Sequence, residues 1–121
     1  METSTFDVCV IGAGPAGYSA AMRAHDLGKK VALVERAKVG GAGIHAGALS
    51  SKTMWHLSND YSVARRTDRG DGAGGGIEVS YPHVCRSVAS AVGERRALLE
   101  RQLDRLAAPP PAGGRVTLVK G

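Results

Sequence analysis

The amino-acid sequence predicts an α/β fold with a parallel β-sheet, and three observations lead to this prediction. A short apolar run at residues 6–11 ends in a glycine-rich turn. Alanines then recur at helical spacing up to Leu27, and a second apolar run follows at residues 30–35. A strand, a turn, a helix and a second strand within about 30 residues are typical of two parallel strands joined by a right-handed crossover.

Each element of this βαβ opening has its own sequence signal. Residues 6–11 (FDVCVI) form a nearly continuous apolar run, which predicts a strand buried on both faces and a buried, inert thiol at Cys9. Pro15 fits the first turn of the helix, where its missing N–H is not needed, and Gly28 ends the helix. Residues 30–35 (KVALVE) predict a second strand that ends on an acid.

The rest of the chain predicts two more helices and one more strand. We expect a glycine-rich loop at residues 39–43, a helix from about Ala46 into the low sixties, and a mobile, exposed loop at about 66–76. Ser80 is the candidate N-cap of a long helix that ends at the PPPAGG segment, and the VTLV segment after it predicts a third strand. Residues 1–121 therefore make one domain at most, with an incomplete sheet.

The turn after the first strand carries the spacing GxGxxG, at Gly12, Gly14 and Gly17. The first glycine makes the tight turn, the second lets the backbone approach a pyrophosphate, and the third lets the helix pack close to the strand. Glu35 follows Gly17 by 18 residues and ends the second strand, where an acid accepts hydrogen bonds from ribose hydroxyls. The motif predicts a Rossmann-like dinucleotide-binding domain. The alternative is a tight βα turn beside an incidental surface glutamate.

Three motifs together narrow the choice of dinucleotide: VIGAGPAG, then VALVER, then GGAGIHAGALSSKTM. This combination resembles the N-terminal part of the FAD domain of the pyridine nucleotide-disulphide oxidoreductases, and the resemblance implies FAD as the cofactor. It also implies that the first glycine loop binds the FAD pyrophosphate and that Glu35 holds the ribose. By the same resemblance the glycine pair Gly40 and Gly41 passes near the phosphates of the cofactor, and Lys52 lies beside the flavin ring. The cofactor-binding residues expected from these motifs are Gly12, Gly14, Pro15, Ala16, Gly17, Glu35, Arg36, Gly40, Gly41, Ala42 and Lys52.

The third motif departs from the family pattern at two reactive positions. Most members of the family carry two redox cysteines there, and an alignment without gaps places them on Gly43 and Ala48. Neither residue has a thiolate, so no thiol-disulphide exchange takes place at these positions. His45 matches a histidine in the motif of the soluble pyridine nucleotide transhydrogenase, so the resemblance leans to that branch, beside lipoamide dehydrogenase. We interpret His45 itself as a loop residue without a chemical role.

Two functions from different classes fit these motifs. The first is the FAD-binding segment of a flavoprotein oxidoreductase that passes hydride between NAD(P)H and the flavin without a CxxxxC disulphide. NAD(P)H is then the co-substrate of a full-length, homodimeric parent, whose nicotinamide-binding and interface domains are absent from these 121 residues. The alternative is a fragment or small nucleotide-binding module with no enzyme activity of its own. Under either interpretation we assign no catalytic and no metal-binding residue.

Composition argues against several other classes of protein. The net charge is +5, but the arginines of VGERRALLERQLDRL alternate with acids at helical spacing and aromatic content is 4%, so we expect a solvated helix face and no nucleic-acid partner. No apolar run is long enough to cross a membrane, and no targeting peptide is visible, which gives a cytoplasmic expectation. Cys9 and Cys85 form neither a CxxC pair nor a metal-type cluster.

Overall fold

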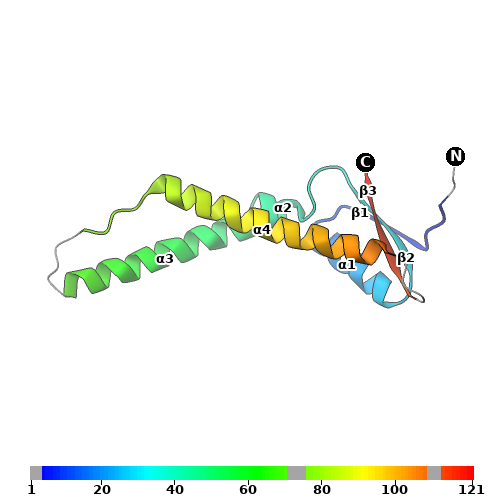
Figure 1. Cartoon of the computed structure of the whole chain (residues 1–121), viewed down its shortest axis with the longest axis horizontal. Coiled ribbons are helices and arrows are strands. Elements are labelled where there is room, and N and C mark those ends of the chain that lie inside the picture. Colours follow the sequence, from blue (N-terminus) through cyan, green and yellow to red (C-terminus); the bar gives the residue numbers. More distant parts are fainter. Residues whose placement is uncertain (1–3, 71–75, 109–112) are drawn as a thin grey trace.

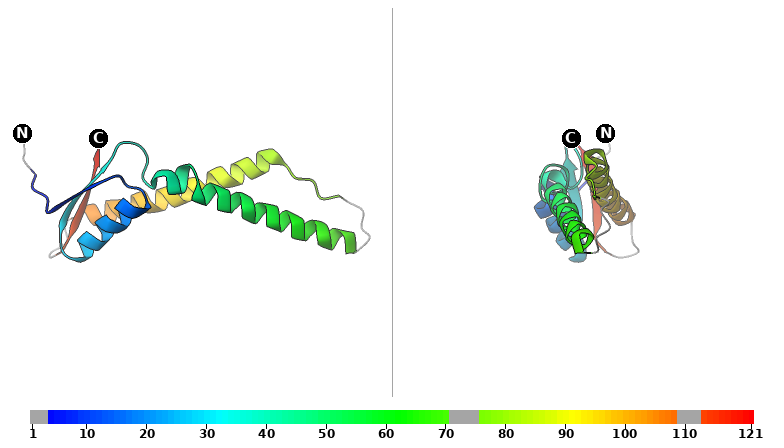
Figure 2. Two further views of the ribbon diagram at one scale, coloured as in Figure 1. Left: turned by 180° about the vertical axis from the view of Figure 1, so that it is seen from behind. Right: turned by 90° about the vertical axis from the view of Figure 1, so that its left-hand side faces the viewer.

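The computed structural model describes residues 4–70, 76–108 and 113–121 (Figure 1). Along the chain the elements are β1 (Val8–Ile11), α1 (Pro15–Asp26), β2 (Lys30–Glu35), α2 (Gly41–His45), α3 (Ala48–Gly70), α4 (Tyr81–Ala107) and β3 (Arg115–Lys120). The sheet, α1 and the end of α4 gather at one end of an elongated molecule. From there α3 and the first half of α4 extend away on the same side and diverge toward the far end, as Figure 2 shows from behind.

The three strands form one parallel sheet in the order β1-β2-β3. In the central strand Val31 pairs with Val8 of β1 on one side and with Val116 of β3 on the other. The predicted α/β fold with a parallel βαβ opening is therefore confirmed. The third strand, expected at residues 116–119, is found at Arg115–Lys120.

Helices α1 and α4 cover one face of this sheet. Alternate residues of a strand point to opposite faces, and on the covered face Val31, Leu33 and Val116 are almost completely buried. They form one core with Ala21 of α1 and Leu103 of α4. Burial of this apolar surface fixes both helices on the sheet, and it sets the first turn of α1 beside the carboxyl end of β1.

The opposite face of the sheet is largely open, and this overturns one expectation. The sequence predicts β1 buried on both faces, but Ile11 is 87% exposed and Cys9 is an exposed free thiol. Val119, which shares a row with Ile11 across the sheet, is 37% exposed. Because β1 is an edge strand and its outer face lacks a covering layer in the described part of the chain, the prediction of a buried thiol at Cys9 is wrong.

Two segments expected as loops are helical. Residues 41–43 belong to the short helix α2, and α3 continues to Gly70, so the prediction of a mobile loop at 66–76 is wrong for residues 66–70. Residues 71–75 lie outside the described residues. Residues 64–69 hold neither glycine nor proline, so this stretch contains no residue that strongly opposes a helix. The helices α3 and α4 contact each other but diverge toward this end of α3 (Figure 1).

The long helix α4 begins as the sequence predicts. The Ser80 hydroxyl oxygen accepts a hydrogen bond from the backbone N–H of His83 at 3.4 Å, which caps the first turn. Gly93 does not interrupt the helix, which runs unbroken to Ala107. Among the residues that the structure describes, no helix is long and apolar enough to span a membrane.

Candidate functional site

The first glycine loop joins β1 to α1 by a turn that only glycine makes easily. Gly12 has a φ of 93°, and its N–H donates to the Val34 carbonyl at 2.7 Å, which carries the pairing of β1 and β2 one residue past the end of β1. A Cβ on Gly17 would overlap the Gly12 carbonyl oxygen. The third glycine of the motif therefore brings the first turn of α1 into backbone contact with the loop.

The N-terminus of α1 presents backbone donors without a side-chain cap. Gly14 is the N-cap residue and makes no capping hydrogen bond, Pro15 follows it, and the first turn contains no acid. The N–H groups of Ala16 and Gly17 lie in that turn, where α-helices have no intrahelical acceptor to offer. Free amides and the positive end of the helix dipole make this terminus suitable for a phosphate group.

The carboxylate of Glu35 ties the end of β2 to this loop. Its Oε2 accepts a hydrogen bond from Ala13 N–H at 2.8 Å and its Oε1 accepts one from Ala37 N–H at 2.8 Å. These backbone hydrogen bonds, from Ala37 first and Ala13 second, hold the pKa of Glu35 below its ordinary value, although burial works against them. Glu35 is 9% exposed, and each carboxylate oxygen keeps a lone pair for a further donor such as a ribose hydroxyl.

The second glycine loop packs directly against the first. Gly40 adopts a left-handed conformation with a φ of 102°, and its N–H donates to the Ala13 carbonyl at 2.8 Å. A Cβ on Gly41 would lie 3.0 Å from the Gly14 Cα. Both backbone groups of Ala13 are therefore hydrogen-bonded: its N–H donates to Glu35, and its carbonyl accepts from Gly40. The structure brings together the two loops that the sequence assigns to one dinucleotide.

The two positions that lack cysteine differ in the space around them. A Cβ on Gly43 would lie 2.8 Å from the Pro15 Cγ, so no side chain fits there unless one of the two loops moves. Ala48 is exposed at the start of α3. The two cysteines of the chain lie elsewhere, Cys9 on β1 and Cys85 on α4, and both are free and exposed.

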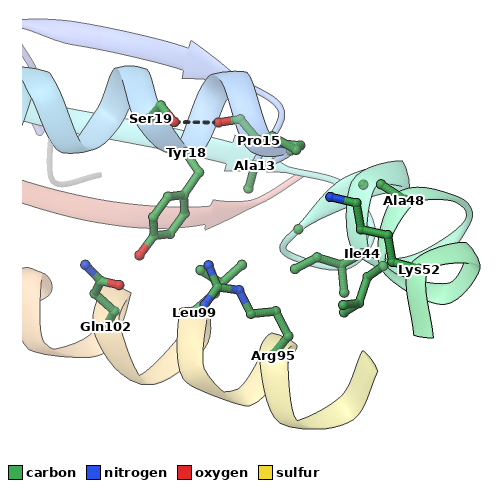
Figure 3. Close-up of a pocket in the computed structure, with 14 residues that line it drawn as sticks. Ala13, Pro15, Tyr18, Ser19, Ile44, Ala48, Lys52, Arg95, Leu99 and Gln102 are labelled. Atoms are coloured by element: carbon green, nitrogen blue, oxygen red, sulfur yellow. Dashed lines mark hydrogen bonds between the residues drawn. The ribbon is translucent and has the colours of Figure 1, made fainter. Parts of the chain in front are cut away.

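A cavity of about 440 Å³ opens between the glycine loops and the helices (Figure 3). Its lining comes from the first glycine loop and α1 (Ala13, Gly14, Pro15, Tyr18, Ser19), the second loop and α2 (Gly40, Gly43, Ile44), α3 (Ala48, Leu49, Lys52) and α4 (Arg95, Leu99, Gln102). Four residues expected to bind the cofactor, Gly14, Pro15, Gly40 and Lys52, are in this lining. In Figure 3 the Lys52 side chain extends from α3 in the direction of the first turn of α1.

The other expected residues lie around the cavity rather than in its lining. Gly12, Gly17 and Gly41 shape the loops behind it, and Glu35 braces them from the end of β2. Ala16, Arg36 and Ala42 are exposed near the loops. His45 contacts the Val39 carbonyl through Nε2 at 2.9 Å, but it is the last residue of the helix α2 and not a loop residue as expected.

Sequence reasoning missed the contribution of α4 to the cavity. It interprets the arginines of α4 as a solvated face, but Arg95, Leu99 and Gln102 line the cavity from positions i, i+4 and i+7, which lie on one side of a helix. That spacing is visible in the sequence. Only the packing of α4 against the sheet shows which side faces the glycine loops.

Tyr18 of α1 is another residue to which the sequence analysis gave no role. Its phenol extends from α1 toward Arg95 and Gln102 of α4 (Figure 3). The hydroxyl oxygen is buried and has no hydrogen-bond partner among the described residues. Burial raises the pKa of Tyr18, and the positive charge of Arg95 opposes that rise. A buried donor without a partner beside a cavity is a feature that a ligand would satisfy.

Comparisons with known proteins agree with this arrangement. A sequence profile described as pyridine nucleotide-disulphide oxidoreductase matches residues 6–109. Dihydrolipoyl dehydrogenase 3 of Pseudomonas aeruginosa is 48% identical over 103 residues, which cover 84% of this chain and 21% of that protein. Dihydrolipoyl dehydrogenase of Geobacillus stearothermophilus is 32% identical over 121 residues, which cover 100% of this chain and 23% of that protein.

A solved structure shows the same fold. The copper(II) complex of the HOCl-induced flavoprotein disulfide reductase RclA from Escherichia coli matches 98% of this chain with a TM-score of 0.72, at 19% sequence identity. The match covers 22% of that chain. The 121 residues therefore span less than a quarter of the length of the relatives that they match.

Proposed function

The chain belongs to the pyridine nucleotide-disulphide oxidoreductase family, and from this premise we propose that residues 1–121 form the N-terminal part of an FAD-binding domain. FAD is the cofactor that this family implies, with NAD(P)H as co-substrate of the full-length parent. The observation that carries the proposal is a pair of hydrogen bonds at Ala13. The Ala13 N–H donates to Glu35 Oε2 at 2.8 Å, and the Ala13 carbonyl accepts from the Gly40 N–H at 2.8 Å. These two hydrogen bonds set both glycine loops beside the uncapped N-terminus of α1.

The residues present fit the chemistry of FAD at three points. The uncapped amides of Ala16 and Gly17 suit the negative charge of a pyrophosphate. The ionised Glu35 suits the hydroxyls of the adenosine ribose. Lys52 lies in the cavity lining next to Ala48 on α3, where its positive charge would stabilise negative charge that develops on a reduced flavin.

We further propose that the parent protein transfers hydride between NAD(P)H and the flavin without a protein disulphide. FAD supplies the redox chemistry when it is bound, and the chain supplies binding, orientation and electrostatics. Support comes from Gly43 and Ala48, which have no sulfur, and from the packing of Gly43, where an added Cβ would lie 2.8 Å from the Pro15 Cγ and one of the two would have to shift. A transhydrogenase-like reaction, from one nicotinamide to another through the flavin, needs no thiol.

Gel filtration of the purified chain with FAD tests the first proposal. We expect flavin absorbance near 450 nm to elute with the protein, whereas riboflavin, which lacks the pyrophosphate and adenosine, elutes separately. A protein that is folded by circular dichroism and elutes without flavin would contradict it. That outcome would support the alternative of a module with no flavoenzyme function of its own.

A full-length parent tests the second proposal. We expect such a protein to oxidise NAD(P)H with a nicotinamide analogue or a quinone as acceptor, and to show no activity with dihydrolipoamide or another dithiol. Dithiol activity that is lost when the remaining cysteines are replaced by serine would rule out the thiol-free route, since electrons would then pass between the dithiol and the flavin through a protein disulphide.

A further inference from the structure

Arg95 lines the cavity and has no counter-ion among the residues that the structure describes. In the described part of the chain no carboxylate lies within the 4.0 Å of an ion pair with Arg95, and the cavity lining contains no acid. The neighbouring Arg96 differs, because its Nε binds Glu100 Oε1 at 2.9 Å across one helical turn. The two adjacent arginines of α4 therefore have different surroundings, and only Arg95 lines the cavity.

Tyr18 meets Arg95 across the cavity from α1. Its buried hydroxyl lacks a hydrogen-bond partner among the described residues, and the guanidinium of Arg95 is close enough to lower the pKa of this phenol against the effect of burial. Figure 3 shows both side chains directed into the space between α1 and α4. The guanidinium only donates and the phenol O–H can donate, so an anion between the two side chains would accept hydrogen bonds from both.

We propose that Arg95 and Tyr18 form an anion-binding wall that holds the pyrophosphate of the dinucleotide against the first turn of α1. The proposal rests on the FAD function proposed above and adds two residues to it, one of them from a helix that the glycine motifs do not include. Gly14 and Pro15 of the first glycine loop line the same cavity as Arg95, so an anion in the cavity would lie between the start of α1 and the guanidinium. Arginine binds phosphate oxygens through paired N–H donors in one plane.

The size of the expected effect follows from the exposure of Arg95. The residue is solvent-exposed as a whole, and exposed charges contribute less than buried ones. We expect the loss of its charge to weaken FAD binding by about three- to tenfold, and by more at low salt than at high salt. Riboflavin has no phosphate, so any weak binding of riboflavin is expected to stay unchanged.

The experiment compares the wild-type chain with Arg95→Gln, Arg95→Lys and the control Arg101→Gln. Arg101 is an exposed arginine of the same helix that does not line the cavity. FAD and riboflavin affinities are measured by fluorescence at two salt concentrations, after circular dichroism shows that each variant is folded. Weaker FAD binding by Arg95→Gln alone, with partial recovery in Arg95→Lys, supports the proposal. Equal FAD affinity of Arg95→Gln and wild type overturns it and leaves the FAD function intact.

A titration with inorganic pyrophosphate separates failure of this proposal from failure of the FAD function. If the wild-type chain does not bind FAD, the FAD function fails, and the pyrophosphate titration decides on the anion site by itself. In the wild type we expect pyrophosphate to shift the NMR signal of the Arg95 Nε–H and to raise the apparent pKa of Tyr18. In Arg95→Gln we expect no change at Tyr18. A wild-type spectrum that pyrophosphate leaves unchanged overturns the anion site.

Discussion

The Glu35 carboxylate lies 2.8 Å from the backbone nitrogen of Ala13, and this hydrogen bond joins positions 22 residues apart. It fastens the end of β2 to the loop that opens α1. In the family the acid at this position is expected to hold the ribose of FAD, but here it also binds two backbone amides before any ligand is present. Glu35 therefore organises the first glycine loop, in addition to the ribose-binding role that we propose for it.

Replacement of Glu35 by alanine is expected to weaken both the fold and the site. It leaves the N–H groups of Ala13 and Ala37 without their acceptor, which costs about 1 to 3 kcal/mol for buried donors. FAD affinity should fall as well, because the loop loses its brace and the ribose its acceptor. Urea unfolding and FAD titration measure the two effects. Glu78→Ala, at an exposed acid, serves as the control and should change neither the unfolding midpoint nor the FAD affinity. An unchanged urea midpoint in Glu35→Ala would show that the Glu35 hydrogen bonds do not stabilise the fold.

The lowered pKa of Glu35 predicts how stability depends on pH. Because the pKa is lower in the folded chain, the ionised carboxylate contributes stability that is present above its ordinary pKa of about 4.3 and is lost as the pH falls through the folded-state value. We expect the free energy of unfolding to fall as the pH drops below about 4.3 in the wild type, and to fall less steeply in Glu35→Gln. Denaturation at a series of pH values measures both slopes. Parallel curves would mean that other acids cause the acid sensitivity.

Tyr18→Phe should separate ligand binding from stability. In the ligand-free chain the buried hydroxyl has no partner among the described residues, so its removal is expected to leave the unfolding free energy equal or raise it by up to about 1 kcal/mol. FAD or pyrophosphate binding should weaken in the same variant, because the anion loses a donor. Thermal unfolding with and without ligand tests this pair of opposite changes. A variant that is destabilised without ligand would indicate that the hydroxyl has a water or protein partner.

The βαβ opening and the first glycine loop could be predicted from the sequence because their signals are local. Gly12 needs a positive φ, and Gly17 needs contact with the Gly12 carbonyl; both requirements appear as glycine at fixed spacing. The exposure of Cys9 could not be predicted in this way, since burial of a strand depends on what packs on its two faces. An apolar run looks the same in the sequence whether or not its second face is covered.

The role of α4 in the cavity depends on tertiary packing. Arg95 and Arg101 are equivalent in the sequence, as arginines beside acids at helical spacing. Their difference arises from the side of α4 that Leu99 and Leu103 bury against the sheet, which turns Arg95 toward the glycine loops. The extension of α3 to Gly70, in contrast, has a local explanation, because residues 64–69 contain neither glycine nor proline and the glycines that predict a loop begin only at Gly70.

Two glycine-to-alanine changes should have opposite effects. In Gly17→Ala the new Cβ overlaps the Gly12 carbonyl, so the loop must move, and we expect a loss of about 2 kcal/mol or more in stability together with the loss of FAD binding. Gly93 lies inside α4, and a Cβ added there would meet no atom within 4 Å. Gly93→Ala should therefore raise stability by up to about 1 kcal/mol through helix propensity. Urea unfolding compares the pair; a tolerated Gly17→Ala would contradict the close approach of helix and loop.

Restoration of the two cysteines of the family should fail at one position and succeed at the other. Ala48 is exposed, so Ala48→Cys is expected to fold normally and to react with a thiol reagent. At Gly43 a Cβ already lies 2.8 Å from the Pro15 Cγ, and a cysteine sulfur requires still more room. We expect Gly43→Cys to lose about 1 to 3 kcal/mol of stability, the usual cost of overpacking.

The double variant should then form a disulphide slowly or not at all, because a bridge needs both Cβ atoms near their normal separation without strain in the loop. Thiol titration under oxidising conditions, with unfolding curves for each single variant, measures these outcomes. A stable double variant with a rapidly formed bridge would show that Pro15 yields, and that the glycine at position 43 is not required by the packing of the two loops.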